Sequence, residues 1–152
     1  MGFYSEGNAM NRTVAITEAI KNALNTAEFS KDFEATREYV VISELQALNQ
    51  LRVTVVHKGV AGEPRFRSGD VETHTLAIGV MQKPESRANT DLDALAQLVE
   101  EIYQWSRRME LSLPDGAGNA VWVESSSEHL EEYLQQLNQF AAVVTVKFAV
   151  VA

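Results

Sequence analysis

The chain has 152 residues, of which 45% are hydrophobic, and this length predicts one domain with a core of ordinary size. It contains no cysteine, which excludes disulfides and thiolate metal sites. The formal net charge of −8 argues against a general binder of nucleic acids or anionic membranes, because an acidic surface repels both at long range.

The N-terminal segment MGFYSEGNAM has neither the basic region nor the apolar region of a signal peptide. Met10 is the last residue of this segment. We therefore expect residues 1–9 to be a leader or a disordered extension, and residues 10–152 to form a single α+β domain. No stretch reaches the run of about 18 apolar residues that a membrane-spanning helix needs, so we expect no membrane partner.

The first predicted element is a helix from Asn11 to Ala27, with Asn11 or Thr13 as the capping residue. Its apolar residues share one face and most are small, so it should pack closely. The segment Phe33 to Ile42 alternates in polarity and carries charges that discourage further pairing, which predicts an edge strand. Residues 43–49 are expected to form a short helical turn.

Two strands with clear alternation follow, at Leu51 to Lys58 and at Val71 to Lys83, and we expect them to form an antiparallel hairpin. Glycines and a proline interrupt the connection from Gly59 to Asp70, which exceeds the roughly two to five residues that a hairpin needs. This excess length calls for a function. The connection is therefore a candidate assembly loop, with the candidate residues Gly59, Gly62, Arg65, Phe66, Arg67 and Gly69.

The strongest periodic signal is the stretch Thr90 to Met109, which predicts the main amphipathic helix. Its apolar residues recur at steps of three and four, as in a helix that lies on a sheet. These are Leu92, Leu95, Val99 and Ile102. Thr90 is the expected N-cap, and Arg107 and Arg108 should lie in the last turn, where positive charge suits the helix dipole.

The C-terminal third predicts a short strand from Val121 to Glu124, a short helix from Glu128 to Leu137 and a final strand from Gln139 to Val151. We interpret the serine run, residues 125–127, as a cap of that short helix. The final strand is apolar on both faces, which indicates a central strand or an interface on its second face.

Because the strands cluster and do not alternate strictly with helices, the pattern predicts an α+β fold. It should contain a mostly antiparallel sheet with a long hairpin, one main amphipathic helix packed on the sheet, and an N-terminal and a short C-terminal helix. Trp105 and Trp122 are expected in or near the core.

No catalytic constellation is visible. We expect His57 and His74 to be about three residues out of register in the hairpin, roughly 10 Å apart, which is too far for one metal ion. His129 has no metal-ligand spacing, and the sequence lacks a nucleophile elbow and a phosphate loop. The paired carboxylates fall on predicted helix surfaces or caps. We therefore expect no enzyme activity, no metal and no cofactor.

The candidate loop allows three interpretations. Arg65 and Arg67 flank Phe66, and basic residues around an aromatic can contact nucleic acid. Two arginines in an acidic chain are weak evidence for that role, and no sequence-specific nucleic-acid partner is expected. The loop can instead become ordered in an assembly, or it can be an inert connection.

Four segments, in this order and spacing, resemble small phage and prophage structural proteins of the tail-terminator, minor-tail or head–tail joining class. They are ELQALNQLRVTVVHKG (Glu44 to Gly59), HTLAIGVMQK (His74 to Lys83), LDALAQLVEEIYQW (Leu92 to Trp105) and QFAAVVTVKFAV (Gln139 to Val150). The resemblance spans Asn11 to Val151 and is a pattern of strands and helix without a diagnostic motif.

The resemblance implies a non-enzymatic α+β subunit of a virion that closes into a homo-oligomeric ring, often of six copies. Its implied partners are the tail tube and head–tail connector proteins, and its implied location is the virion and, during assembly, the bacterial host cytoplasm. Two other classes stay open. One is a small ligand-binding module with a pocket between the main helix and the sheet, and the other is a protein–protein adaptor with no phage role.

Overall fold

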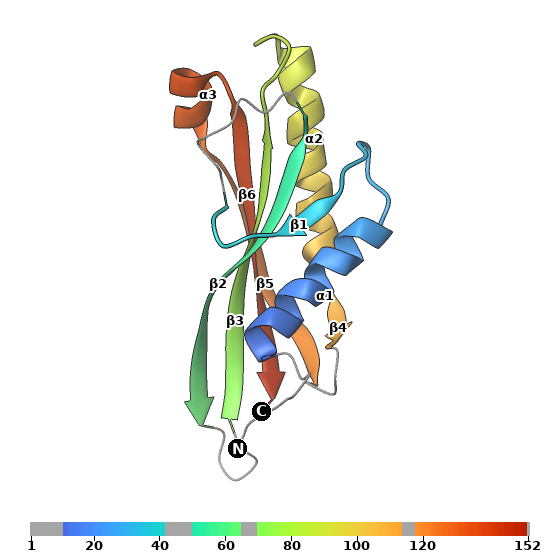
Figure 1. Cartoon of the computed structure of the whole chain (residues 1–152), viewed down its shortest axis with the longest axis vertical. Coiled ribbons are helices and arrows are strands. Elements are labelled where there is room, and N and C mark those ends of the chain that lie inside the picture. Colours follow the sequence, from blue (N-terminus) through green and yellow to red (C-terminus); the bar gives the residue numbers. More distant parts are fainter. Residues whose placement is uncertain (1–10, 42–49, 65–69, 114–117, 152) are drawn as a thin grey trace.

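The computed structural model describes residues 11–41, 50–64, 70–113 and 118–151 (Figure 1). Within these ranges the chain forms three helices and one six-stranded sheet. In chain order the elements are α1 (Arg12–Thr26), β1 (Ala35–Arg37), β2 (Arg52–Pro64), β3 (Asp70–Gln82), α2 (Asn89–Ser106), β4 (Glu110–Ser112), β5 (Asn119–His129), α3 (Glu131–Leu137) and β6 (Phe140–Val151).

The strand order in the sheet is β1-β2-β3-β6-β5-β4. β1 runs parallel to β2, and every other neighbouring pair is antiparallel. The predicted α+β class with a mostly antiparallel sheet and a long hairpin is therefore confirmed. β6 lies between β3 and β5, which confirms the central position that its two apolar faces predicted.

The main core lies between one face of the sheet and the helices α1 and α2. Both helices cover the same side of the sheet, and α3 lies on the opposite side (Figure 1). The helices contribute the buried side chains of Ile16, Ile20, Leu24, Leu95, Leu98, Val99 and Ile102. The central strands contribute alternate residues, which are Leu76, Ile78, Val80, Ala142, Val144, Val146, Phe148 and Val150.

The ends of the two long helices differ in how they are capped. Asn11 caps α1 as predicted, since its side chain accepts a hydrogen bond of 2.8 Å from the backbone N–H of Val14. The prediction for α2 was wrong, because the helix begins at Asn89 and its N-cap residue, Ala88, makes no side-chain cap bond. Instead, Ser86 Oγ accepts from the backbone N–H of Ala88 and donates to Asp91.

The C-terminal end of α2 also lies earlier than predicted. The helix stops at Ser106, and Arg107 is already extended, so the two arginines lie outside the last turn. Arg108 has a φ of 63°, a left-handed conformation that turns the chain into β4. No pattern in the sequence predicted β4.

The predicted bounds of three other elements were wrong. The first edge strand is short, at Ala35–Arg37, although it does lie at the sheet edge. β5 continues to His129 and α3 begins only at Glu131, so the serine run lies within a strand and does not cap a helix. Long-range pairing with β6 decides this, since Ser125–Ser127 lie opposite Val146–Val144. The predicted turn over residues 43–49 falls outside the described residues.

Candidate functional site

The candidate assembly loop is mostly strand. We use the name hairpin arm for Gly59–Pro64 of β2 and Asp70–Thr75 of β3, which pair from Gly59 opposite Thr75 to Pro64 opposite Asp70. The predicted long loop from Gly59 to Asp70 was therefore wrong in extent. Gly59 and Gly62 lie in the arm, and apart from their chain neighbours no described residue has an atom within 4 Å of a Cβ added at either glycine. Arg65, Phe66, Arg67 and Gly69 lie outside the described residues.

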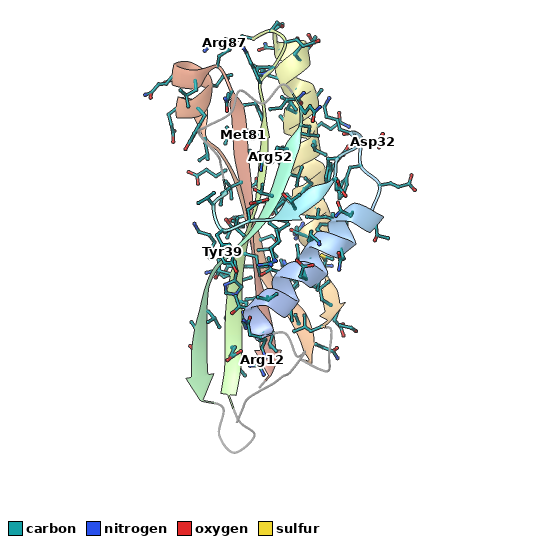
Figure 2. The ribbon with its side chains drawn as sticks, in the orientation of Figure 1. Arg12, Asp32, Tyr39, Arg52, Met81 and Arg87 are labelled. Carbon is teal, nitrogen blue, oxygen red and sulfur yellow. The ribbon has the colours of Figure 1, made fainter. Side chains whose placement is uncertain are left out.

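A row of polar side chains connects the arm to α1. The guanidinium of Arg12 donates to Glu72 Oε1 at 2.7 Å, and that oxygen lies 3.2 Å from His74 Nε2. The other ring nitrogen of His74, Nδ1, lies 2.8 Å from His57 Nε2. Arg12, at the N-terminal end of α1, is labelled in Figure 2. The row ties the first turn of α1 to the middle of both hairpin strands.

The two hairpin histidines are therefore in contact, and the predicted separation of about 10 Å was wrong. That prediction placed the middle of the turn near residue 64, whereas the strands continue to Pro64 and start again at Asp70. The longer strands put His57 opposite Leu76, and a bulge before Gly59 brings Val60 opposite His74. The alternation of Glu72 and His74 on one strand face was the signal in the sequence that could have revealed this row.

Burial and charge shift the pKa values of His57 and Glu72 in this row. The pKa of His57 is lowered from 6.5, first by burial and then by the neighbouring His74, so neutral imidazole is favoured at neutral pH. The pKa of Glu72 is lowered mainly by its hydrogen bond from Arg12. His74 is 1% exposed, so its two bonded ring nitrogens satisfy a polar group inside the protein.

The sheet face away from α1 and α2, called here the open face, is only partly covered. At one end Leu130 and Tyr133 from around α3 pack on Met81 and Ala141. Beside them is a groove of about 410 Å³ that has Ala77, Val143 and Thr145 among its lining residues. The segment after β1 forms one wall of this groove, and its side chains of Tyr39 and Val40 are 80% and 63% exposed.

A close backbone approach holds the segment after β1 on the open face. Thr54 Oγ1 donates to the carbonyl oxygen of Val41 at 2.8 Å. Gly79 permits this approach, since a Cβ at that position would lie 2.6 Å from Val41 Cγ1 and 2.9 Å from both Val41 O and Thr54 Oγ1. The sequence does not predict this role of Gly79, because no residue near it in the chain indicates the contact with Val41.

Both tryptophans pack against the main core, as predicted. The indole N–H of Trp122 donates to Ser125 Oγ at 2.7 Å, and that hydroxyl lies 2.8 Å from Ser106 Oγ at the end of α2. These contacts use Ser125 to join β5 to α2. They give the first serine of the run a structural role in place of the predicted cap.

No cluster of three metal-ligating side chains occurs among the described residues. In the described part of the chain, no helix is long and apolar enough to cross a membrane. The sequence left open a ligand pocket between the main helix and the sheet. The interior there is packed, since Leu95, Leu98 and Ile102 are buried. Hollows of about 410 Å³ each border the open face and the outer side of α2 near Trp105, and one of about 140 Å³ lies between Gln82 and the start of α2.

Comparison with known proteins adds a likeness of fold. No family model matches the chain, and no curated protein matches it. A solved structure described as the virion of a native gene transfer agent (GTA) particle contains a chain that is similar, with 15% sequence identity and a TM-score of 0.58. The match covers 91% of this chain and 96% of that chain.

Proposed function

We propose that the chain is a structural, non-enzymatic protein of a phage-like particle. Within that class, we propose a ring-forming tail terminator, or a minor-tail or head–tail joining subunit. It would contact further copies of itself, the tail tube and connector proteins, and it would lie in the virion after assembly in the bacterial cytoplasm.

One observation supports this proposal above the others. The similar chain belongs to a structure of a virion, and the match covers nearly the full length of both chains. A likeness of that extent concerns the whole arrangement of helices and strands, and is not limited to one common motif. The resemblance of the four sequence segments to tail and neck proteins points to the same class independently of the coordinates.

Features of the surface also suit an assembly protein. Large hydrophobic side chains are exposed at several places on the described surface, namely Tyr39, Val40, Val60, Val121, Val123 and Leu137. Two of them border the open-face groove, and such exposed apolar side chains mark candidate contact surfaces. The net charge of −8 would keep DNA from adhering to a ring through which it passes.

The experiment is immunogold electron microscopy of particles released by the bacterium that encodes the chain, together with mass spectrometry of the purified particles. The proposal expects the chain in the particles and gold at the junction of head and tail. Absence of the chain from intact particles would overturn the proposal. Gold distributed along the whole tail would overturn the terminator and joining roles but retain a structural one.

A further inference from the structure

The sheet has two free edges in the described part of the chain. β1 pairs only with Val53–Val55, so β2 has no described strand on its outer side from His57 to Pro64. At the opposite edge of the sheet, β4 pairs only with Asn119–Val121. β5 therefore has no described strand on its outer side from Val123 to His129. Each free edge offers unpaired backbone N–H and C=O groups to another strand.

We propose that these two edges pair with each other between neighbouring copies, so that the free edge of β2 in one copy joins that of β5 in the next. This inference rests on the proposed ring and specifies which strands form the joint between its copies. The strand directions fit, because β2, β3, β6 and β5 alternate in direction across the sheet. A second copy in the same orientation therefore brings β5 antiparallel to β2.

The joint requires each copy to be shifted along the strand direction by a fixed distance relative to the next copy, and this shift is called the step. Ser126, in the middle of the free β5 edge, lies level with Ala77 of β3 through Thr145 of β6. Ala61, in the middle of the free β2 edge, lies opposite Thr73 of β3. The two midpoints are thus four residues apart along β3, which is about 14 Å at roughly 3.4 Å per residue.

This step is what a closed ring of strands needs. The four strands from β2 to β5 span about 19 Å per copy at roughly 4.8 Å per strand. A step of about 14 Å over that width tilts the strands by about 36° from the ring axis, and closed barrels have tilts of about 35–45°. The positions of the short strands β1 and β4 set this step, since each covers the part of an edge that does not pair with the neighbouring copy.

The charges on the two edges are complementary. Lys58 projects on the open face beside the free edge of β2, and Glu128 projects on the same face beside the free edge of β5. Neither forms an ion pair with a described residue. Placing Ala61 opposite Ser126 brings Lys58 close to Glu128 of the next copy. Opposite charges on facing strands stabilise pairing, and like charges oppose it.

The test reverses each charge and then mixes the variants. Wild type, Lys58→Glu, Glu128→Lys and the control Lys83→Glu are compared by sedimentation velocity over a concentration series. Lys83 is exposed just beyond β3, away from both free edges, so its variant matches the charge change of Lys58→Glu. Circular dichroism and thermal melting confirm that each variant is folded.

We expect wild type and Lys83→Glu to assemble alike, whereas each single reversal raises the midpoint concentration of assembly about tenfold. An equimolar mixture of Lys58→Glu and Glu128→Lys should assemble like wild type, because every joint between unlike variants pairs opposite charges. A pairing of β2 with β2 would instead leave Glu128→Lys assembling like wild type, because Glu128 lies on β5.

Each outcome decides a separate point. Rings that are indifferent to both reversals, or a mixture that stays unassembled, overturn the joint but leave the ring and the virion role intact. A wild type that stays monomeric at its highest attainable concentration also overturns the joint. Rescue by mixing, combined with absence of the chain from particles, supports the joint and overturns the proposed function.

Discussion

Gly79 makes a sharp test of the packing on the open face. The change is Gly79→Ala, which adds one methyl group in the middle of β3. The new Cβ would lie 2.6 Å from Val41 Cγ1 and 2.9 Å from Val41 O, distances that side-chain carbons do not tolerate. Either the segment after β1 moves away from the sheet or the strands separate.

The expected cost comes from two effects. Forcing one extra methyl group into a packed contact costs about 1–3 kcal/mol. Displacing Val41 also breaks the bond that its carbonyl accepts from Thr54, which contributes about 1 kcal/mol. We therefore expect Gly79→Ala to lower the free energy of unfolding by about 2–4 kcal/mol.

The assay is urea denaturation followed by circular dichroism, with Gly62→Ala as the matched control. Gly62 lies in the neighbouring strand, where no described residue beyond its chain neighbours comes within 4 Å of an added Cβ. Its replacement should therefore leave stability unchanged or raise it by up to about 1 kcal/mol. In a Val41→Ala background, which removes the nearest atom, Gly79→Ala should cost less. Equal stability of the two glycine variants would refute the close approach.

Three further predictions concern the core and the polar contacts. Val99→Asp should unfold the protein, because an unpaired buried charge costs several kcal/mol, comparable with the total stability; a cooperative melt of this variant would show that the assigned helix face is wrong. Ser125→Ala should lower the free energy of unfolding by about 1–3 kcal/mol, since the Trp122 indole loses its acceptor, whereas Ser126→Ala on the exposed side should change it by less than about 0.5 kcal/mol in the same melts. The lowered pKa of His57 means that the unfolded chain binds more protons just below pH 6.5, so stability should fall as the pH drops through that range. Urea melts from pH 5 to 8 measure this slope, and a slope unchanged in His57→Gln would contradict the assignment.

Local patterns in the sequence were sufficient to predict the elements whose buried face follows from their own periodicity. The stripe of Leu95, Val99 and Ile102 faces the core as predicted, and the two apolar faces of the last strand correctly placed it inside the sheet. The Asn11 cap was also predictable, because it depends on atoms only three residues apart. In each case the burial or the hydrogen bond follows from residues that are near one another in the sequence.

The features that long-range pairing decides were not predictable in this way. The length of β5 depends on β6, which overrides the tendency of serine to cap a helix. The position of the hairpin turn and one bulge decide that His57 meets His74, and a shift of a few residues in register would separate them.

The amino-acid sequence was sufficient to predict the α+β class, the main helix, the central strand and the acidic surface. The fold was needed to show which glycine permits a close contact, which histidines touch and which strand edges stay unpaired. The difference arises because periodicity indicates which face of an element is buried, whereas the register between distant strands determines which atoms come into contact. The proposed joint between copies depends on the second kind of information.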